Sequence, residues 1–595
     1  MTKRKNSLIN FIIALVPVMV LAVVVGTFLD YYYELNDDVL MKDILSGMYA
    51  GIPSGYNIQM QWPLSAFIAL LYKICPSVSW YGLLLLVFQY GSLIIIGDRL
   101  IKNISKTSLK ILTAVSVTLM FASYMLFHMN LIQYTVTVSM MAGAAIAILA
   151  TCDDTKTPKA FLFSNIPTIV ILFLGFMLRS EMMLLMMPFV CATAVYKWSL
   201  KDLFSKETIT KYLSAFLVIA GSFLIAAACN KIAYSSQGWA DFVDLFNART
   251  ELYDYQTPPQ YEGNTRFYEG VGLSKEEAIL FENYNYGISP KVDNNLMWAV
   301  ANYAGDVNSY SRSTIEKLSE KIKIYIYEFT HVWNTPGADY PWNIAVILLY
   351  ILCVLIIILS KDYIGLWKVI ALFAGRSAIW IYMLMGERTP KRITDSLYFV
   401  ETVTLIFLLS MLIISRHNSE NKSAPADTAS TMQKARSVIA ITIIDVVAIA
   451  LGMVFLIDAV PQLKYELVLK DVANAPYLEF YEYINRHPDK FYLMDTYSSV
   501  AYSEKMFDDT AHIDKSNMNT LGGWAALSPI ENEKLKQHGL NNMYEGLLNE
   551  DVYFCKQKDI DMTWLEDFYK AQGNDINVTL EDTVSSFEIY KVTAK

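Results

Sequence analysis

Two adjacent acidic residues follow the first apolar segment of the chain and open a stretch with helical spacing. The sequence reads Asn36-Asp37-Asp38, and Leu40, Ile44 and Met48 then recur on one helical face. This pattern predicts an amphipathic helix at a membrane surface, with the acidic pair at its N-terminus, where the helix dipole favours anions. The pair is either a helix cap with a solvated neighbour or a carboxylate placed at the membrane surface as a general base.

Farther along the chain, two short polar segments interrupt the apolar sequence. Gln61-Trp62-Pro63-Leu64 precedes an apolar stretch too short to span a membrane, which predicts an interfacial or re-entrant helix with proline in its first turn. Arg179-Ser180-Glu181 separates two apolar segments. It is either a simple ion pair in a turn or a cation and a carboxylate that face a cavity.

A strongly basic loop lies late in the chain. The seven residues Gly386-Glu387-Arg388-Thr389-Pro390-Lys391-Arg392 include three cations, and the topology derived below places them outside the membrane. Cations are rare on that side, so either this topology is wrong or an anion holds the cations there. A phosphate at the outer surface is the natural candidate, since arginine binds phosphate through two parallel hydrogen bonds.

Two charged residues lie inside predicted membrane segments on either side of this loop. Arg376 and Glu401 are at similar depth, and a charge there is costly unless it is paired. We predict that they form a structural pair, with Asp445 as the alternative partner of Arg376. If Glu401 is the only partner, reversing both charges should preserve expression, whereas reversing either one alone should not.

The elements that must position these residues are mostly membrane helices. Apolar residues make up 54% of the 595 residues and charged residues 18%, which argues against an ordinary soluble enzyme or a disordered chain. We predict about eleven spans. They lie near residues 8–29, 80–98, 110–127, 131–151, 161–178, 182–197, 211–229, 342–360, 364–385, 395–415 and 437–458.

The distribution of lysine and arginine gives an orientation. Lys3, Arg4 and Lys5 place the N-terminus in the cytoplasm, and the predicted cytoplasmic loops 99–109, 152–160, 198–210, 361–363 and 416–436 also carry basic residues. The loops 30–79, 230–341 and 386–394 and the tail from residue 459 are then extracytoplasmic. We therefore predict a transmembrane domain over 1–458 in a plasma membrane, and the lysine-bearing short loops suit a bacterium.

The tail, residues 459–595, has no apolar block of membrane length and is predicted to be a small α/β domain. Strands are expected at 490–495, 551–555 and 586–592, and a helix at 564–571. The tail has 13 basic and 23 acidic residues, a charge of −10, while the whole chain has −9. In the long loop, residues 313–333 have the spacing of an amphipathic helix that either packs in a subdomain or lies on the membrane beside a groove.

Several classes of function find no support in the sequence. The negative charge argues against nucleic acid as a partner. The six histidines and six cysteines show no metal-ligand spacing, and neither a phosphate-binding P-loop nor a nucleophile elbow is present. The sequence therefore predicts no cofactor with certainty.

Taken together, these features resemble the GT-C superfamily of integral membrane glycosyltransferases, which includes protein O-mannosyltransferases and aminoarabinose transferases. The resemblance rests on the order of elements over residues 1–415. After the first membrane helix come Asp37-Asp38, the helix ending in Ser46-Gly47, Pro63-Leu64, the Arg179-x-Glu181 motif and the late loop with Arg388, Pro390 and Arg392.

The resemblance implies transfer of a sugar from a polyprenyl phosphate to an extracytoplasmic glycan, glycolipid or protein acceptor, with inversion at the anomeric carbon. By match to the family motif, Asp37 is the base and Asp38 orients the acceptor or assists. Arg388 and Arg392, with help from Lys391, match the position of the cations that bind the lipid phosphate. A divalent cation is optional in the superfamily, and Asp37, Asp38 and Asp43 could bind one.

Three other classes remain open. A transporter or flippase for a lipid-linked glycan would also have many helices and internal charges. A wall-polysaccharide polymerase or ligase of another fold would use a long outer loop with arginines, and a receptor would use the tail to bind a ligand. The acidic pair directly after the first helix favours the GT-C interpretation over these.

Overall fold

The computed structural model describes residues 2–200, 204–309, 314–423 and 429–595. Parts of two predicted cytoplasmic loops, at 201–203 and 424–428, and residues 310–313 of the long loop, including Ser313, lie outside the described residues. The chain divides into two compact units, and each is treated on its own. The first comprises residues 1–34, 82–227 and 317–466, and the second comprises residues 35–81, 228–316 and 467–595.

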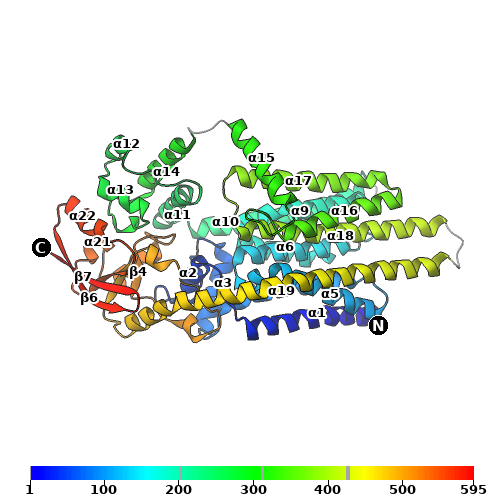
Figure 1. Cartoon of the computed structure of the whole chain (residues 1–595), viewed down its shortest axis with the longest axis horizontal. Helices are drawn as coiled ribbons and strands as arrows, with labels where there is room; N and C mark the ends of the chain where they lie inside the picture. Colours follow the sequence, from blue (N-terminus) through cyan, green and yellow to red (C-terminus); the bar gives the residue numbers. More distant parts are fainter. Residues whose placement is uncertain (1, 201–203, 310–313, 424–428) are drawn as a thin grey trace. The chain divides into compact units, whose positions relative to one another are not determined.

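The first unit is a bundle of apolar helices (Figure 1). It contains α1 (Thr2–Phe28), α4 (Trp80–Ile101), α5 (Thr107–Asn130), α6 (Tyr134–Thr151), α7 (Pro158–Ser164), α8 (Ile166–Leu178), α9 (Ser180–Trp198), α10 (Lys206–Ala233), α16 (Trp342–Ser360), α17 (Leu366–Met385) and α18 (Lys391–Ser423). It also contains most of α15 (Thr314–Thr330) and the first part of α19 (Ala429–Asn485). After α1 and α5, the two-residue strands β1 (Tyr32–Tyr33) and β2 (Leu131–Ile132) pair in parallel.

Within the described ranges, nine helices are long and apolar enough to cross a membrane: α1, α4, α5, α6, α10, α16, α17, α18 and α19. The helices α7 and α8 meet at an angle of 51° and count as one further span if they are taken together. These ten segments coincide with predicted spans. The eleventh, at 182–197, forms the helix α9, which begins directly after Arg179 but is not among the candidate spans.

The helix α6 lies at the centre of this bundle, where it packs against α8, α9 and α18 (Figure 1). Nearly all its residues are buried, and many are small: Ala142, Gly143, Ala144, Ala145 and Ala147. Small residues let helix backbones approach closely, which is how helices associate where lipid removes the hydrophobic driving force. A Cβ atom at Gly143 would lie 2.7 Å from the ring of Phe399, so this close approach requires glycine.

The predicted pair of Arg376 and Glu401 is confirmed. The Nε of Arg376 donates to Oε2 of Glu401 over 2.8 Å, and both residues are buried. The carboxylate also accepts from Tyr350, and Tyr325 accepts from the guanidinium. Four aromatic rings surround the cation: Tyr325, Phe329, Trp380 and Tyr398. The alternative partner, Asp445, instead accepts a hydrogen bond from Thr113.

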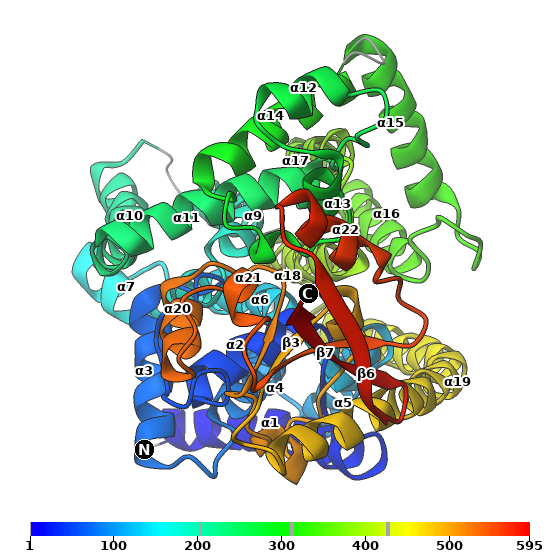
Figure 2. The same ribbon diagram turned by 90° about the vertical axis from the view of Figure 1, so that its left-hand side faces the viewer.

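The second unit combines helices with a mixed sheet (Figure 2). Its helices are α2 (Asn36–Ser46), α3 (Trp62–Ile74), α11 (Gln237–Thr250), α12 (Thr265–Gly270), α13 (Lys275–Glu282), α14 (Asn294–Ser309), α20 (Pro529–Gln537), α21 (Met543–Gly546) and α22 (Thr563–Ala571). Its strands are β3 (Phe491–Met494), β4 (Met518–Thr520), β5 (Val552–Gln557), β6 (Ile576–Val584) and β7 (Phe587–Ala594).

The sheet has the strand order β4-β3-β5-β7-β6, in which β3 pairs in parallel with both neighbours and β5, β7 and β6 pair antiparallel. The predicted strands at 490–495, 551–555 and 586–592 and the helix at 564–571 are confirmed as β3, β5, β7 and α22. The strands β4 and β6 were not expected. The strand β4 has only three residues, and β6 is largely exposed and polar, so neither has the pattern of a buried strand.

The hydrophobic core of the sheet is not built from the tail alone. Leu493, Phe554 and Phe568 are buried in one cluster with Leu280 and Ile288, which come from the long loop. Backbone bonds add to this connection, because Gly287 donates to the carbonyl of Leu521. The tail and part of the loop at 230–341 therefore fold as one body.

The aromatic surroundings of Arg376 change the expected result of exchanging the two charges. Arg376→Met alone should lower the free energy of unfolding by about 3–5 kcal/mol, because it leaves Glu401 buried without its counter-ion. Arg376→Met combined with Glu401→Gln should recover much of this loss. The exchange Arg376→Glu with Glu401→Arg should not recover it, since it places a carboxylate among the faces of aromatic rings. Thermal unfolding in detergent would rank the stabilities of these three variants. Full recovery of stability in the charge-exchanged variant would contradict the prediction.

Candidate functional site

The acidic pair lies in α2, as predicted. Asp37 and Asp38 are in the first turn, where the helix dipole stabilises negative charge. The helix ends at Gly47, whose φ is 89° and whose N–H donates to the carbonyl of Asp43. A side chain at this position would meet Pro53 at 2.7 Å, so glycine is required for both conformation and space.

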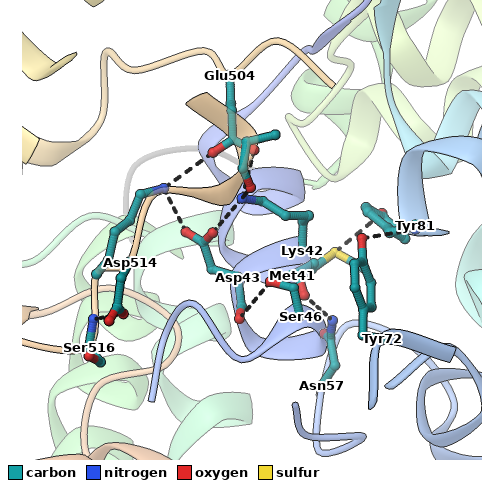
Figure 3. A network of polar contacts seen from close by, with 12 residues as sticks. Met41, Lys42, Asp43, Ser46, Asn57, Tyr72, Tyr81, Glu504, Asp514 and Ser516 are labelled. Atoms are coloured by element: carbon teal, nitrogen blue, oxygen red, sulfur yellow. Dashed lines mark hydrogen bonds and ion pairs between the residues drawn. The ribbon is translucent and has the colours of Figure 1, made fainter. Parts of the chain in front are cut away.

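A ring of four buried charges fixes α2 within the second unit (Figure 3). The Nζ of Lys42 lies 2.7 Å from Oδ1 of Asp43 and 2.7 Å from Oε1 of Glu504. The Nζ of Lys515 lies 2.8 Å from Oδ2 of Asp43 and 3.3 Å from Oε2 of Glu504. None of the four residues is more than 7% exposed. Each cation therefore contacts both anions, and the ring has no net charge.

The surroundings of this ring shift the pKa values of Asp43 and Lys515 in the direction of the charged form. Burial raises the pKa of Asp43, but Lys42 and Lys515 outweigh burial and bring it below its ordinary value. Burial lowers the pKa of Lys515, and Asp43 and Glu504 outweigh it and raise it above its ordinary value. Both shifts favour the ionised forms of Asp43 and Lys515 at neutral pH.

This ring alters the expected character of α2. The sequence predicts a surface helix with one apolar face, whereas Asp38, Lys42, Asp43 and Ser46 are buried as well. The physical reason is that the segment containing Glu504 and Lys515 covers the polar face and neutralises its charges. The neighbouring helix α3 begins with Pro63 in its first turn, as predicted, and leaves Phe67, Leu70 and Ile74 more than half exposed. That exposed apolar row is typical of an interfacial helix.

A cavity of about 410 Å³ opens beside α2 within the second unit. Its charged lining residues are Asp37, Asp43, Arg249, Lys515 and Lys534. Its aromatic lining residues are Tyr49, Tyr284, Tyr481, Tyr497, Tyr502 and Trp524. Cavities of this size bind small organic ligands, and a lining of aromatic faces with a few charged groups suits a saccharide, which has both apolar and hydroxyl surfaces.

The two members of the acidic pair have different positions. Asp37 lines the cavity and is partly exposed. Asp38 is fully buried, is not among the lining residues, and accepts a hydrogen bond of 2.8 Å from the hydroxyl of Tyr81. Asp37 is therefore the carboxylate that a ligand can reach, while Asp38 helps to fix α2.

Arg249 of α11 interacts electrostatically with Asp37. Burial lowers the pKa of Arg249, but Tyr286, Tyr284, Asp254 and Asp37 together outweigh burial and raise it. Its guanidinium lies 3.7 Å from Asp254 and faces the rings of Tyr253 and Tyr284. A carboxylate and an arginine from separate parts of the sequence therefore influence each other at one cavity.

The basic loop belongs to the first unit. Lys391 is the first residue of α18 and is exposed, while Arg388 and Arg392 are partly buried. Glu387, within the same loop, lies 3.4 Å from Lys317 and 3.2 Å from Lys321 of α15. The loop therefore has two additional lysines beside it. The predicted amphipathic helix at 313–333 is present as α15, and its residues Leu318, Ile322 and Ile326 are exposed by more than a third.

Arg179 and Glu181 form the simple ion pair that one interpretation predicted. The Nε of Arg179 lies 3.2 Å from Oε2 of Glu181, whose side chain is 72% exposed. The guanidinium also lies over the ring of Tyr134. The pair joins the break between α8 and α9.

The acidic residues of α2 do not fit a metal site. Asp43 is occupied by two lysines and Asp38 by Tyr81. Over the described ranges, no group of three or more histidine, cysteine, aspartate or glutamate side chains is arranged to hold a metal ion.

Sequence reasoning missed Arg249, Glu504, Lys515 and Lys534. Each lies in a polar stretch far in sequence from α2, so local spacing contains no signal for it. The one available signal was Lys42-Asp43 itself, an ionic pair within the otherwise apolar run from Val39 to Leu45. Buried charges of this kind require partners elsewhere in the chain.

Comparisons with known protein families, with curated proteins and with solved structures found no match for this chain.

Loss of one member of the ring should destabilise the second unit strongly. Glu504→Gln should lower the free energy of unfolding by about 3–5 kcal/mol, because Lys42 and Lys515 then share a single buried carboxylate. Glu533→Gln, on the exposed face of α20, is the matched control and should have little effect. Adding Lys42→Met to Glu504→Gln should cost less than the sum of the single changes. A double-mutant cycle by thermal unfolding measures this, and additive losses would show that the ring does not act as a unit.

Proposed function

We propose that this chain is an integral membrane glycosyltransferase that moves a sugar from a polyprenyl-phosphate carrier to an extracytoplasmic glycan, glycolipid or protein acceptor. The observation that supports the proposal most is the position of Asp37. It is a carboxylate in the first turn of a rigidly held helix, and it lines a cavity whose aromatic and charged residues suit a saccharide. The many long apolar helices suit a lipid-linked donor.

The proposed reaction needs a base, a leaving group and cations that stabilise the negative charge on the leaving phosphate. The acceptor hydroxyl attacks the anomeric carbon of the donor sugar, and Asp37 takes the hydroxyl proton. The bond from the anomeric carbon to the phosphate oxygen breaks, and its electrons leave with the lipid phosphate. Attack from the side opposite the phosphate inverts the anomeric centre. No nucleotide is consumed, because the bond between the sugar and the lipid phosphate, which breaks in this step, already contains the driving force.

Cations near the leaving phosphate would stabilise the negative charge that develops on it. We assign this role to Arg388 and Arg392, with Lys391 in support. Arginine suits the role because its planar guanidinium binds two phosphate oxygens at once. Lys317 and Lys321 support this assignment, because their ion pairs with Glu387 neutralise its carboxylate. That carboxylate then repels a phosphate at the loop less strongly.

Removing the proposed base should abolish most of the transfer while the protein stays folded. Asp37→Asn retains the shape of the side chain but takes up no proton, and turnover should fall by about 10²–10⁴-fold. The measurement is transfer of a labelled sugar from a polyprenyl-phosphate donor to cell-envelope acceptors. Asp575→Asn, an exposed aspartate in the same unit, is the control and should transfer normally. Unchanged turnover in Asp37→Asn would rule out its role as the base.

Removing the two arginines should affect the donor selectively. Arg388→Ala combined with Arg392→Ala should raise the KM for the lipid-linked donor by at least tenfold and change the KM for the acceptor little, because only the donor has the lipid phosphate. Lys361→Ala, an exposed cation of another loop of the first unit, is the control. Normal binding of labelled polyprenyl phosphate by the double variant would show that this loop does not hold the phosphate.

A further inference from the structure

One charged residue of the cavity is not accounted for by the proposed reaction. Lys534 lies in α20, is 1% exposed and lines the cavity. Its Nζ lies 3.9 Å from the centre of the Tyr49 ring, which covers one side of the ammonium group. An ammonium group has three hydrogen-bond donors, and no residue in the described part of the chain accepts a hydrogen bond from this one.

The other two cations of the cavity differ from Lys534 because each has a carboxylate at ion-pair distance. Lys515 belongs to the ring and contacts both Asp43 and Glu504. Arg249 has Asp254 at 3.7 Å and two aromatic rings. Within the described ranges, Lys534 has no carboxylate at ion-pair distance. It is therefore the cation of this cavity that has no carboxylate partner in the described part of the chain.

Glu531, a carboxylate on the same helix, has hydrogen-bond donors other than Lys534. Glu531 accepts hydrogen bonds from Asn519 and from the backbone N–H of Leu527. Asn519 in turn accepts from the hydroxyl of Tyr49. This chain of contacts directs the carboxylate of Glu531 away from an ion pair with Lys534 and fixes the Tyr49 ring beneath the ammonium group.

Burial affects the ionisation of both groups. It lowers the pKa of Lys534 to about 7 and raises the pKa of Glu531 to about 7. A bound anion would favour the charged form of Lys534, as any adjacent negative charge does. The titratable and charged groups around Lys534 are Glu531 and His538 at α20, Asp43 and Tyr49 at α2 and just beyond it, and Asp514 and Lys515 in the segment before β4.

We propose that Lys534 is the anion-binding residue of this cavity and that its ligand is an acidic saccharide, whose phosphate or carboxylate accepts from the ammonium group. The aromatic side chains would contact the faces of the sugar ring. The ligand class follows from the lining, because a cation without an acceptor and a set of aromatic faces are present in a space of about 410 Å³. This proposal concerns binding and deepens the proposed function by making the acceptor, or the sugar beside it, acidic.

The experiment compares three sugars of similar size with the purified full chain in detergent. Glucose 1-phosphate, glucuronate and glucose are titrated, and binding is followed by isothermal calorimetry. At least one acidic sugar should bind ten times or more tightly than glucose. A preference confined to glucose 1-phosphate assigns the site to phosphate, and one confined to glucuronate assigns it to carboxylate. Equal affinity for all three sugars, or no binding of any, would overturn the proposal.

Variants of α20 assign the effect to Lys534. Lys534→Met should reduce the affinity for the preferred acidic sugar at least tenfold and leave that for glucose unchanged, while Lys534→Arg should retain most of the preference. Lys536→Met removes an exposed lysine of the same helix and is the control. An undiminished acidic preference in Lys534→Met would contradict the proposal. Because the assay contains no lipid donor, its result is independent of whether the protein transfers sugar.

A pH series gives a second measurement that does not need a folded variant. Glucuronate stays ionised between pH 6 and pH 8.5, whereas Lys534 loses its proton as the pH rises through about 7. Affinity for glucuronate relative to glucose should therefore be higher at pH 6 than at pH 8.5 if the carboxylate is the ligand. If only glucose 1-phosphate is preferred, its methyl diester, which keeps one charge over this range, takes the place of glucuronate. A preference that does not change with pH would overturn the assignment to Lys534.

Discussion

The ring of Lys42, Asp43, Glu504 and Lys515 is the constraint on which the second unit depends. Two of its charges are neighbours in α2, and the other two lie more than 450 residues later in the chain. A buried charge is tolerated only when it is paired and its hydrogen bonds are satisfied. The helix α2 can therefore be buried on its polar side only when the segment with Glu504 and Lys515 is in place. Backbone contacts strengthen the connection, because Lys515 donates its N–H to the carbonyl of Met48.

This constraint also fixes the position of the proposed base at the start of α2. Asp37 is less than two helical turns before Lys42 in α2. Because the ring holds this helix in place, it also holds Asp37 at the edge of the cavity. Tyr49, three residues after the last residue of α2, is held by Asn519 and extends the same arrangement to Lys534. One helix and its immediate continuation thus relate the proposed base and the proposed anion site.

The parts of this structure that sequence could predict are those with local causes. Membrane helices follow from long apolar runs, β3, β5 and β7 from short runs of buried aliphatic and aromatic residues, and the pairing of Arg376 with Glu401 from the cost of charge in lipid. The cavity has no local cause. Arg249, Lys515 and Lys534 are ordinary charged residues in polar sequence, and only the tertiary fold brings them to α2. The aromatic rings around Arg376 escaped prediction for the same reason, since Tyr325 and Phe329 come from a different helix.

Some charged residues of this protein pair with one another in its interior, and others line the cavity, where a ligand can contact them. Arg376 and Glu401 pair with each other and are enclosed by aromatic side chains, and the four members of the ring pair among themselves. These charges therefore stabilise the fold. Asp37, Arg249 and Lys534 line the cavity outside the ring. The proposed base, an arginine beside one carboxylate and a lysine without an acceptor are different chemical groups. A single ligand that engages all three needs a proton to give, hydroxyls to be oriented and an acidic group. An acidic saccharide has all of these, and the proposed transfer and the proposed anion site therefore favour ligands of one class at the same cavity.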